Sequence, residues 1–171
     1  TILPWGIAIQ NLLEVTPEAH ARFDATKRTY EYLILRDKDP FRNDLGYKFN
    51  VSLDLDSMNK ACQLLLGEHD FGCFCKANTD NFTNLCNVSE ANWREIDNML
   101  VFTISANRFL RNMVRAIVGT MLDIGQGKTS VENLKTIIAS KDRTAAGRSV
   151  PAQGLYLTKV EYPSQIFVKN K

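Results

Sequence analysis

The sequence is poor in the residues and patterns on which many enzyme classes and membrane proteins depend. Its 171 residues include two histidines and four cysteines, and they contain no GxSxG, P-loop, HExxH or GxGxxG pattern. No apolar run approaches the ~18 residues that a bilayer span needs, and we expect no signal peptide. We therefore expect a cytoplasmic protein with reduced cysteines, without a membrane segment or a disulfide framework.

The overall composition is ordinary for a globular domain, but the charge is unevenly distributed. Hydrophobic residues make up 44% of the chain and charged residues 23%, with a net charge of +2. Residues 1–97 carry 10 Lys and Arg against 15 Asp and Glu, whereas residues 98–160 carry 9 against 3, a net of +6. The second region predicts a basic surface that suits phosphates. An incidental excess of charge on a solvated surface is the alternative.

Alternating and helical patterns of apolar residues predict a mixture of strands and helices. Strands are expected at residues 6–15, 27–35, 46–51, 92–96, 99–106 and 154–162, and helices at 57–66, 107–124 and 129–140. Residues 68–90 show no clear period, so we expect an irregular segment there.

Local signals mark the ends of several of these elements. Asp56 is expected to cap the first helix, and Thr129 with Glu132 forms a capping box for the third. Asp97-Asn98 lies between two strand patterns and predicts a β-hairpin. We expect a single domain over residues 1–171 of the α+β class, with an antiparallel or mixed sheet and helices packed on one face.

Three arginines lie at positions i, i+3 and i+7 of the helix expected at 107–124: Arg108, Arg111 and Arg115. This spacing places them on one face of a helix, and no acidic residue lies between them. A row of guanidinium groups suits phosphates or a catalytic carboxylate. A solvent-exposed stripe on an amphipathic helix explains the same spacing equally well.

Two tyrosines share one face of the strand expected at 27–35, namely Tyr30 and Tyr32. Basic residues precede them at Arg22, Lys27 and Arg28. Aromatic rings beside basic side chains suit the stacking of bases and the binding of phosphates. Packing of the two rings in the core is the alternative.

A zinc site is a weaker hypothesis. His69, Cys73, Cys75 and Cys86 supply four nitrogen and sulfur ligands, which tetrahedral zinc accepts. Their spacing lacks the usual pair of CxxC knuckles, so we expect reduced cysteines and no metal.

Five segments of the chain match the motifs of one family in order and approximate spacing. They are HARFDATKRTYEYLI (20–34), GEHDFGCF (67–74), NRFLRNMVRAIVGTMLDIG (107–125), KDR (141–143) and AQGLYLTKVEYP (152–163). On these motifs the chain resembles the tRNA pseudouridine synthase A family from about residue 3 to residue 163. The FLxxMVRxIVG helix motif and the closing GLYL strand are the most specific parts.

The resemblance implies an isomerase that converts uridine to pseudouridine in the anticodon stem-loop of tRNA, without a cofactor. The family breaks the N1–C1′ bond, turns the base and joins C5 to C1′. Its catalytic aspartate lies in an Arg-Thr-Asp-Ala-Gly motif, which this sequence lacks. The resemblance therefore implies the C-terminal half of a longer enzyme, a homodimer when complete, and a fragment that is inactive alone.

The resemblance also assigns roles to individual residues. Tyr30 matches the tyrosine that stacks on the target base, and Arg115 matches the arginine that pairs with the catalytic aspartate. Either Leu155 or Leu157 forms the apolar wall of the uracil pocket, and the sequence does not separate them. The candidate phosphate contacts are Arg22, Arg28, Arg108 and Arg111. The sequence departs from the family at Cys73 and Cys86, where serine or threonine and arginine are common.

Two other classes of function remain open from the residues. The first is an RNA-binding module with no chemistry of its own, and the second is a small zinc-binding interaction domain. An aspartate motif upstream in the reading frame would favour the enzyme. A metal assay on the purified protein would test the zinc domain.

Overall fold

The protein forms a mixed β-sheet with helices on one face. The structure is a computed structural model and describes residues 2–76, 79 and 81–168. The strands are β1 (Lys27–Leu35), β2 (Tyr47–Lys48), β3 (Gly67–Asp70), β4 (Leu85–Ile96), β5 (Met99–Ala106) and β6 (Leu155–Glu161). The helices are α1 (Leu55–Gln63), α2 (Met113–Gly125) and α3 (Asn133–Ser140), with short 3-10 turns at Gly72–Phe74, Arg143–Ala145, Ala152–Gly154 and Ser164–Ile166.

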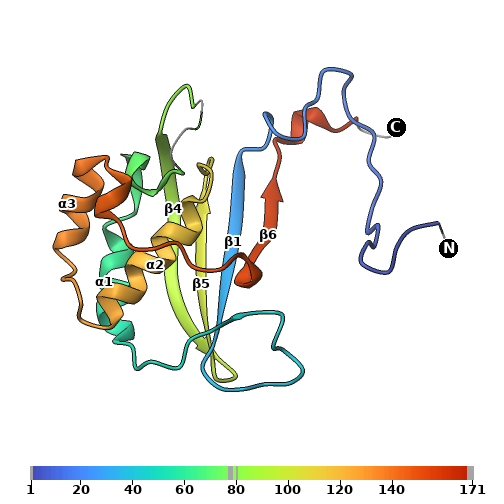
Figure 1. Cartoon of the computed structure of the whole chain (residues 1–171). Coiled ribbons are helices and arrows are strands. Elements are labelled where there is room, and N and C mark those ends of the chain that lie inside the picture. Colours follow the sequence, from blue (N-terminus) through green and yellow to red (C-terminus); the bar gives the residue numbers. More distant parts are fainter. Residues whose placement is uncertain (1, 77–78, 80, 169–171) are drawn as a thin grey trace.

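The sheet confirms the expected α+β class. Its order is β2-β1-β5-β4-β3, and β6 pairs with β1. The β1–β2 pair is parallel and the other pairs are antiparallel, so the sheet is mixed. The three helices lie together on one face, and β6 forms an outer strand (Figure 1). In the described residues, none of the helices is both long and apolar enough to cross a membrane.

The hydrophobic core lies between this face of the sheet and the helices. Ile34 of β1 and Phe102 and Ile104 of β5 are fully buried, as are Ile117 and Met121 of α2. Alternate strand residues and helix residues four apart point to the same side, which explains why these side chains meet. Each buried side chain of this size stabilises the fold by about 1.5–3 kcal/mol relative to exposure.

The expected hairpin is confirmed. The strands β4 and β5 pair antiparallel from Ile96↔Met99 onward, with Asp97 and Asn98 between them. Both turn residues have positive φ angles, 47° and 61°. Asn and Asp tolerate this left-handed conformation better than most residues, so the turn suits the twist of the strands.

The helix expected from residue 107 begins six residues later. Asn112 has a φ of 70°, which interrupts the helical backbone, and α2 starts at Met113. Arg108 and Arg111 therefore lie in the connection between β5 and α2, whereas Arg115 lies in the helix. The prediction that the three arginines share one helical face is wrong.

Two strand predictions are also corrected. Residues 6–15 form no strand in the structure, because they have no neighbouring strand to pair with apart from a single bridge from Val15 to Phe167. An alternating pattern favours a strand, but an extended segment is stable only beside a partner. The strand expected at 46–51 is reduced to Tyr47–Lys48.

The segment expected to be irregular is shorter than predicted. Gly67–Asp70 pairs with the start of β4, and β4 itself begins at Leu85. In the described residues, the part of this segment without a strand is therefore confined to 71–76, 79 and 81–84, and it includes the 3-10 turn at Gly72–Phe74. Buried and exposed residues partly alternate along β4. The polar residues within the strand conceal this pattern in the sequence.

The helix caps lie near the predicted residues rather than on them. The carboxylate of Asp54, not Asp56, accepts a hydrogen bond from the Ser57 amide at 3.0 Å and caps α1. Before α3, the hydroxyl of Ser130 accepts from the Asn133 amide at 3.2 Å. Such side-chain oxygens satisfy amide groups that lack a partner in the first turn of a helix.

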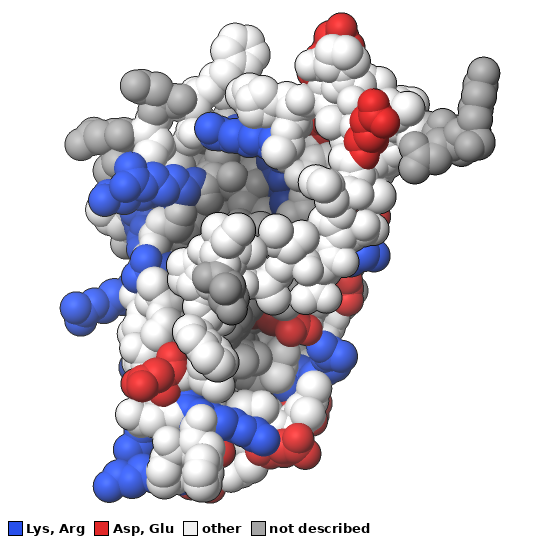
Figure 2. All heavy atoms as spheres, turned by 90° about the vertical axis from the view of Figure 1, so that its right-hand side faces the viewer, with Lys and Arg blue, Asp and Glu red and all other residues white. Residues whose placement is uncertain are grey.

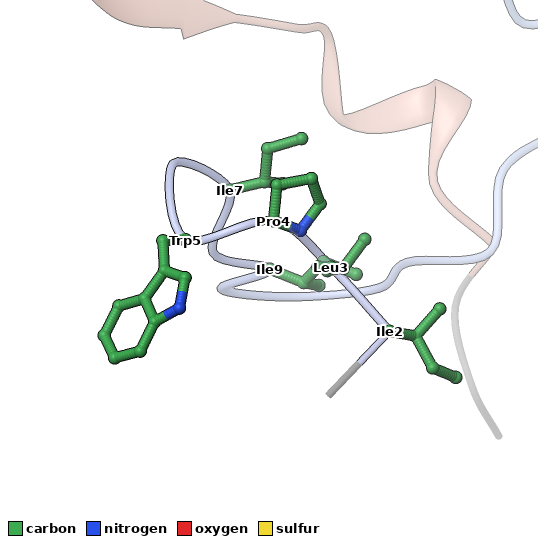
Figure 3. Close-up of a pocket in the computed structure, with 6 residues that line it drawn as sticks. All are labelled: Ile2, Leu3, Pro4, Trp5, Ile7 and Ile9. Carbon is green, nitrogen blue, oxygen red and sulfur yellow. The ribbon is translucent and has the colours of Figure 1, made fainter.

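The N-terminal segment lies outside the core. Among the described residues, its pocket is lined by Ile2, Leu3, Pro4, Trp5, Ile7 and Ile9, and the Trp5 ring points away from the others (Figure 3). Within the described residues, the hydrogen bonds of residues 2–13 stay inside the segment, from Ile7 to Pro4 and from Leu12 to Asn11. This pocket brings together no polar groups of the sheet, so it is not a candidate site.

Removal of residues 1–13 is expected to leave the folded domain intact. The side chains of residues 2–13 are exposed, so their loss should change the free energy of unfolding by less than about 0.5 kcal/mol. Urea unfolding of the shortened and the complete 171-residue chains tests this expectation. A loss of several kcal/mol would mean that the segment packs on the domain in solution.

Candidate functional site

A hollow at the β6 edge of the sheet contains four of the eight residues to which the family resemblance assigns a role, namely Arg22, Arg28, Tyr30 and Leu157. Its lining residues are Ala21, Arg22, Arg28, Tyr30, Phe109, Leu157, Val160 and Tyr162. They come from β1, from β6 and its end, from the turn before β1, and from the connection before α2. Figure 2 views the molecule from this side: Lys and Arg side chains gather beside a hollow in the upper part of the view.

Tyr30 lies at the centre of this site. It pairs with Leu157 in the β1–β6 register, and its ring meets the Phe109 ring edge to face, with centroids 5.1 Å apart. Such a geometry holds an aromatic ring in a defined orientation. The Tyr30 side chain is partly exposed, so part of its surface is available to a ligand. An oriented ring beside an aliphatic side chain suits a planar base.

The structure distinguishes the two leucines of β6. Leu155 pairs with the fully buried Tyr32 and packs against the hydrophobic core. Leu157 is 51% exposed and lines the hollow beside Tyr30. Leu157 is therefore the leucine that shares a hollow with Tyr30.

The predicted phosphate contacts have different surroundings. The Arg28 guanidinium donates to the carbonyls of Ala25 and Asn107, both at 2.6 Å, and to that of Arg22. Arg22 is exposed, with its guanidinium 5.6 Å from the centroid of the Phe23 ring. Arg111 is exposed as well.

Arg115 lines a second hollow, distinct from that of Tyr30. The lining residues of this hollow are Tyr47, Phe49, Arg115, Gly119, Leu122, Asp123, Gln126, Lys128, Arg148, Ser149, Val150 and Pro151. The Arg115 Nε atom donates to the Val150 carbonyl at 2.6 Å. Among the described residues, none accepts a hydrogen bond from the two terminal amino groups of Arg115. These groups can therefore hold an additional anion.

Tyr32 binds the backbone at one wall of the Arg115 hollow. Its hydroxyl donates to the Pro151 carbonyl at 2.7 Å, next to the carbonyl that Arg115 holds. Burial raises the pKa of the Tyr32 hydroxyl, Tyr47 raises it further and the Arg115 charge lowers it. A neutral hydroxyl suits this donor role. Tyr30 and Arg115, to which the resemblance assigns roles in one reaction, line separate hollows in this structure. Their place in one active site stays a prediction.

A strap formed by residues 146–151 crosses α2 and carries these two carbonyls. It passes close to Gly119, where an added Cβ would lie 1.8 Å from the Arg148 carbonyl oxygen. The Gly147 amide donates to the Thr120 hydroxyl at 2.9 Å, which binds the strap to the helix. The strap therefore determines where the Arg115 side chain is held.

Comparison with known proteins extends these observations to a family. A family model described as tRNA pseudouridine synthase matches residues 61–163, more than half of the chain. The chain belongs to the tRNA pseudouridine synthase family. Proteins named tRNA pseudouridine synthase A are 48% identical over 166 residues in Parabacteroides distasonis, 47% over 169 in Bacteroides thetaiotaomicron and 39% over 163 in Bacillus subtilis.

The alignments with these synthases cover 97%, 97% and 94% of this chain, respectively. They cover 66%, 63% and 66% of the relatives, so the chain spans about two-thirds of their length. The family resemblance recognised from the motifs is thereby confirmed. The roles of the individual site residues stay predictions.

Three residues that line the two hollows received no role from the sequence. Phe109 falls within the helix expected at 107–124, whereas it lies before α2 with its ring against Tyr30. Tyr162 lines the same hollow and donates to the Ala21 carbonyl at 2.7 Å. Arg148 lines the hollow of Arg115. Phe109 lies within the FLxxMVRxIVG motif, which was the one available signal.

The zinc hypothesis finds no support in the geometry. In the described part of the chain, no three His, Cys, Asp or Glu side chains are grouped as a metal site. All four cysteines are buried free thiols. Burial raises the pKa of Cys62 and of Cys73 to about 12 and that of Cys86 to about 11. Burial therefore favours the protonated form of these three thiols.

Proposed function

We propose that this chain is the C-terminal part of a tRNA pseudouridine synthase, a single domain over residues 1–171. The longer enzyme isomerises uridine to pseudouridine in the anticodon stem-loop of tRNA. The observation that supports this proposal most is the hollow that brings together Tyr30 and Leu157, in a chain 48% identical to a tRNA pseudouridine synthase A. We further propose a cytoplasmic homodimer that requires no cofactor.

In this proposal the target base lies on the Tyr30 ring with Leu157 as an apolar wall. An aspartate from the part of the enzyme upstream of this chain acts at C1′ of the nucleotide. The N1–C1′ bond breaks, the base turns and C5 joins C1′. C5 then loses its proton and N1 gains one, so the reaction is an isomerisation without a redox partner.

Arg115 is proposed to hold the aspartate carboxylate. A guanidinium beside a carboxylate favours its ionised form, which suits a nucleophile or a base. The Nε atom of Arg115 is already bound to the Val150 carbonyl, so the terminal amino groups remain to pair with the carboxylate. Exposed arginines such as Arg22 and Arg111 are proposed to contact phosphates, as is the half-buried Arg108.

The 171-residue chain alone is expected to form no pseudouridine. It lacks the Arg-Thr-Asp-Ala-Gly motif, and no other residue is proposed to act at C1′. The test incubates unmodified tRNA with this chain and, separately, with the longer enzyme encoded by the complete reading frame, and measures pseudouridine chemically. The control is the longer enzyme with the motif aspartate replaced by alanine.

The outcomes separate the two candidate functions. Turnover by the longer enzyme alone, abolished by the aspartate substitution, supports the synthase. Turnover by the 171-residue chain would require a different nucleophile and would contradict the proposed mechanism. Binding of tRNA without turnover by either protein would favour the RNA-binding module, which the missing aspartate motif keeps as the alternative.

A further inference from the structure

We propose that Arg28 is a positioning residue, which holds two chain segments that line the hollow of Tyr30, and not a phosphate contact. The inference rests on the proposed synthase function for its kinetic consequences. Its structural content depends only on the contacts of the Arg28 side chain.

The Arg28 guanidinium joins two segments that are distant in the sequence. One amino group donates to the carbonyls of Ala25 and Asn107, each at 2.6 Å, and the other donates to the carbonyl of Arg22. Ala25 and Arg22 belong to the turn before β1, whereas Asn107 follows β5. A planar group with several fixed donors can bind all of these carbonyls together, which a lysine ammonium cannot do in the same geometry.

The Asn107 contact controls the position of Phe109. The Asn107 side-chain oxygen accepts from the Asn87 amide at 2.8 Å, and the Asn107 amide donates to the Asn87 carbonyl at 3.1 Å. With its own carbonyl bound by Arg28, Asn107 is held on both sides. Phe109 lies two residues later, with its ring edge to face with Tyr30. A shift of Asn107 would therefore move the ring that orients Tyr30.

The contact between Arg28 and the Arg22 carbonyl holds the turn before β1, which forms another part of the hollow. Two consecutive carbonyls of the turn are bound by different parts of the chain: the Tyr162 hydroxyl, just after β6, donates to Ala21 at 2.7 Å, and Arg28 of β1 donates to Arg22. Ala21, Arg22 and Tyr162 all line the hollow. Arg28 thus fixes the backbone from which the Arg22 side chain projects.

The surroundings of the two arginines indicate a division of roles. Arg28 is partly buried, and its two terminal amino groups point at backbone carbonyls. In the described residues, the exposed Arg22 side chain has no hydrogen-bond acceptor, and its guanidinium lies near the Phe23 ring. A phosphate contact needs donors that face the solvent, so Arg22 suits this role and Arg28 does not.

The kinetic test uses Arg28→Lys in the longer enzyme. The single-turnover rate at saturating enzyme is expected to fall on the order of tenfold or more, because small displacements of positioned groups reduce rates strongly. The affinity for tRNA should change little. Arg94→Lys is the matched control, since Arg94 is a hydrogen-bonded arginine whose partners are Glu31 and Thr103. Its rate and affinity should equal those of the wild type.

Two further measurements test whether Arg28 binds a phosphate and whether it acts through Phe109. Arg28→Met should leave the salt dependence of tRNA binding unchanged, whereas loss of a phosphate contact lowers the slope by roughly 0.7–0.9. Combination of Arg28→Lys with Phe109→Ala should cost less than the product of the two separate rate losses. A loss equal to that product would mean that Arg28 does not act through Phe109. A smaller salt dependence of tRNA binding in Arg28→Met would overturn the proposal.

A readout without activity separates this proposal from that of the synthase function. In the protein labelled with fluorotyrosine, Arg28→Lys should shift the ¹⁹F resonance of Tyr30 and leave that of Tyr47 in place. If the wild type forms no pseudouridine but the Tyr30 resonance shifts, the synthase proposal fails and the positioning role stands. If neither the resonance nor the single-turnover rate changes, Arg28 is not a positioning residue.

Discussion

Replacement of Arg115 by lysine in the longer enzyme is expected to lower the single-turnover rate about a hundredfold, which corresponds to roughly 3 kcal/mol. The reason is that the Arg115 side chain makes two separate contacts. Its Nε atom binds the Val150 carbonyl at 2.6 Å, and its terminal amino groups are proposed to hold the catalytic carboxylate. Lysine keeps the charge but has no planar fork with which to perform both tasks.

The affinity for tRNA should fall much less than the rate, because phosphate contacts are spread over several basic residues. The test measures the single-turnover rate and the tRNA affinity of the same variant. Arg94→Lys serves as the control, since Arg94 lines neither hollow and has no assigned role in the reaction. Equal losses of rate and affinity would make Arg115 a binding residue. No loss of either would show that Arg115 has no role in the reaction.

Gly119→Ala is expected to destabilise the protein by about 3 kcal/mol, through a clash between α2 and the strap of residues 146–151. The added Cβ would lie 1.8 Å from the Arg148 carbonyl oxygen, so the backbone of the strap has to move. Alanine otherwise favours a helix interior over glycine by about 1 kcal/mol. The predicted loss is therefore the excess of the clash over this gain.

Urea unfolding of the 171-residue chain measures this effect. Gly6→Ala is the matched control, because a Cβ there would meet nothing within 4 Å. Its free energy of unfolding should equal that of the wild type. An unchanged or higher stability of Gly119→Ala would show that the strap can leave the helix at no cost. Movement of the strap would also displace the carbonyls that hold Arg115 and Tyr32.

Features that depend on neighbouring residues in the chain could be predicted from the sequence. The alternation of 27–35 predicted the whole of β1, and Asp97-Asn98 predicted the β4–β5 hairpin. The match to the family motifs predicted the family. A turn and a strand face are determined within a few residues, so the sequence contains their signal locally.

The tertiary structure decided which of the candidate side chains share a hollow. The pairing of β6 with β1 places Leu157, and not Leu155, at the hollow of Tyr30. The positive φ of Asn112 delays the start of α2 and separates Arg108 and Arg111 from the helix of Arg115. None of these facts has a local sequence signal.

The same distinction explains residues 6–15 and Arg28. The alternating pattern of 6–15 satisfies the local requirement for a strand, but no strand of the described sheet lies beside it to accept its hydrogen bonds. The guanidinium of Arg28 binds a carbonyl 79 residues away in the chain. The sequence determined which residues favour strands, turns and phosphate contacts. The tertiary structure determined which of them meet, because hydrogen-bond partners and packing neighbours come from distant parts of the chain.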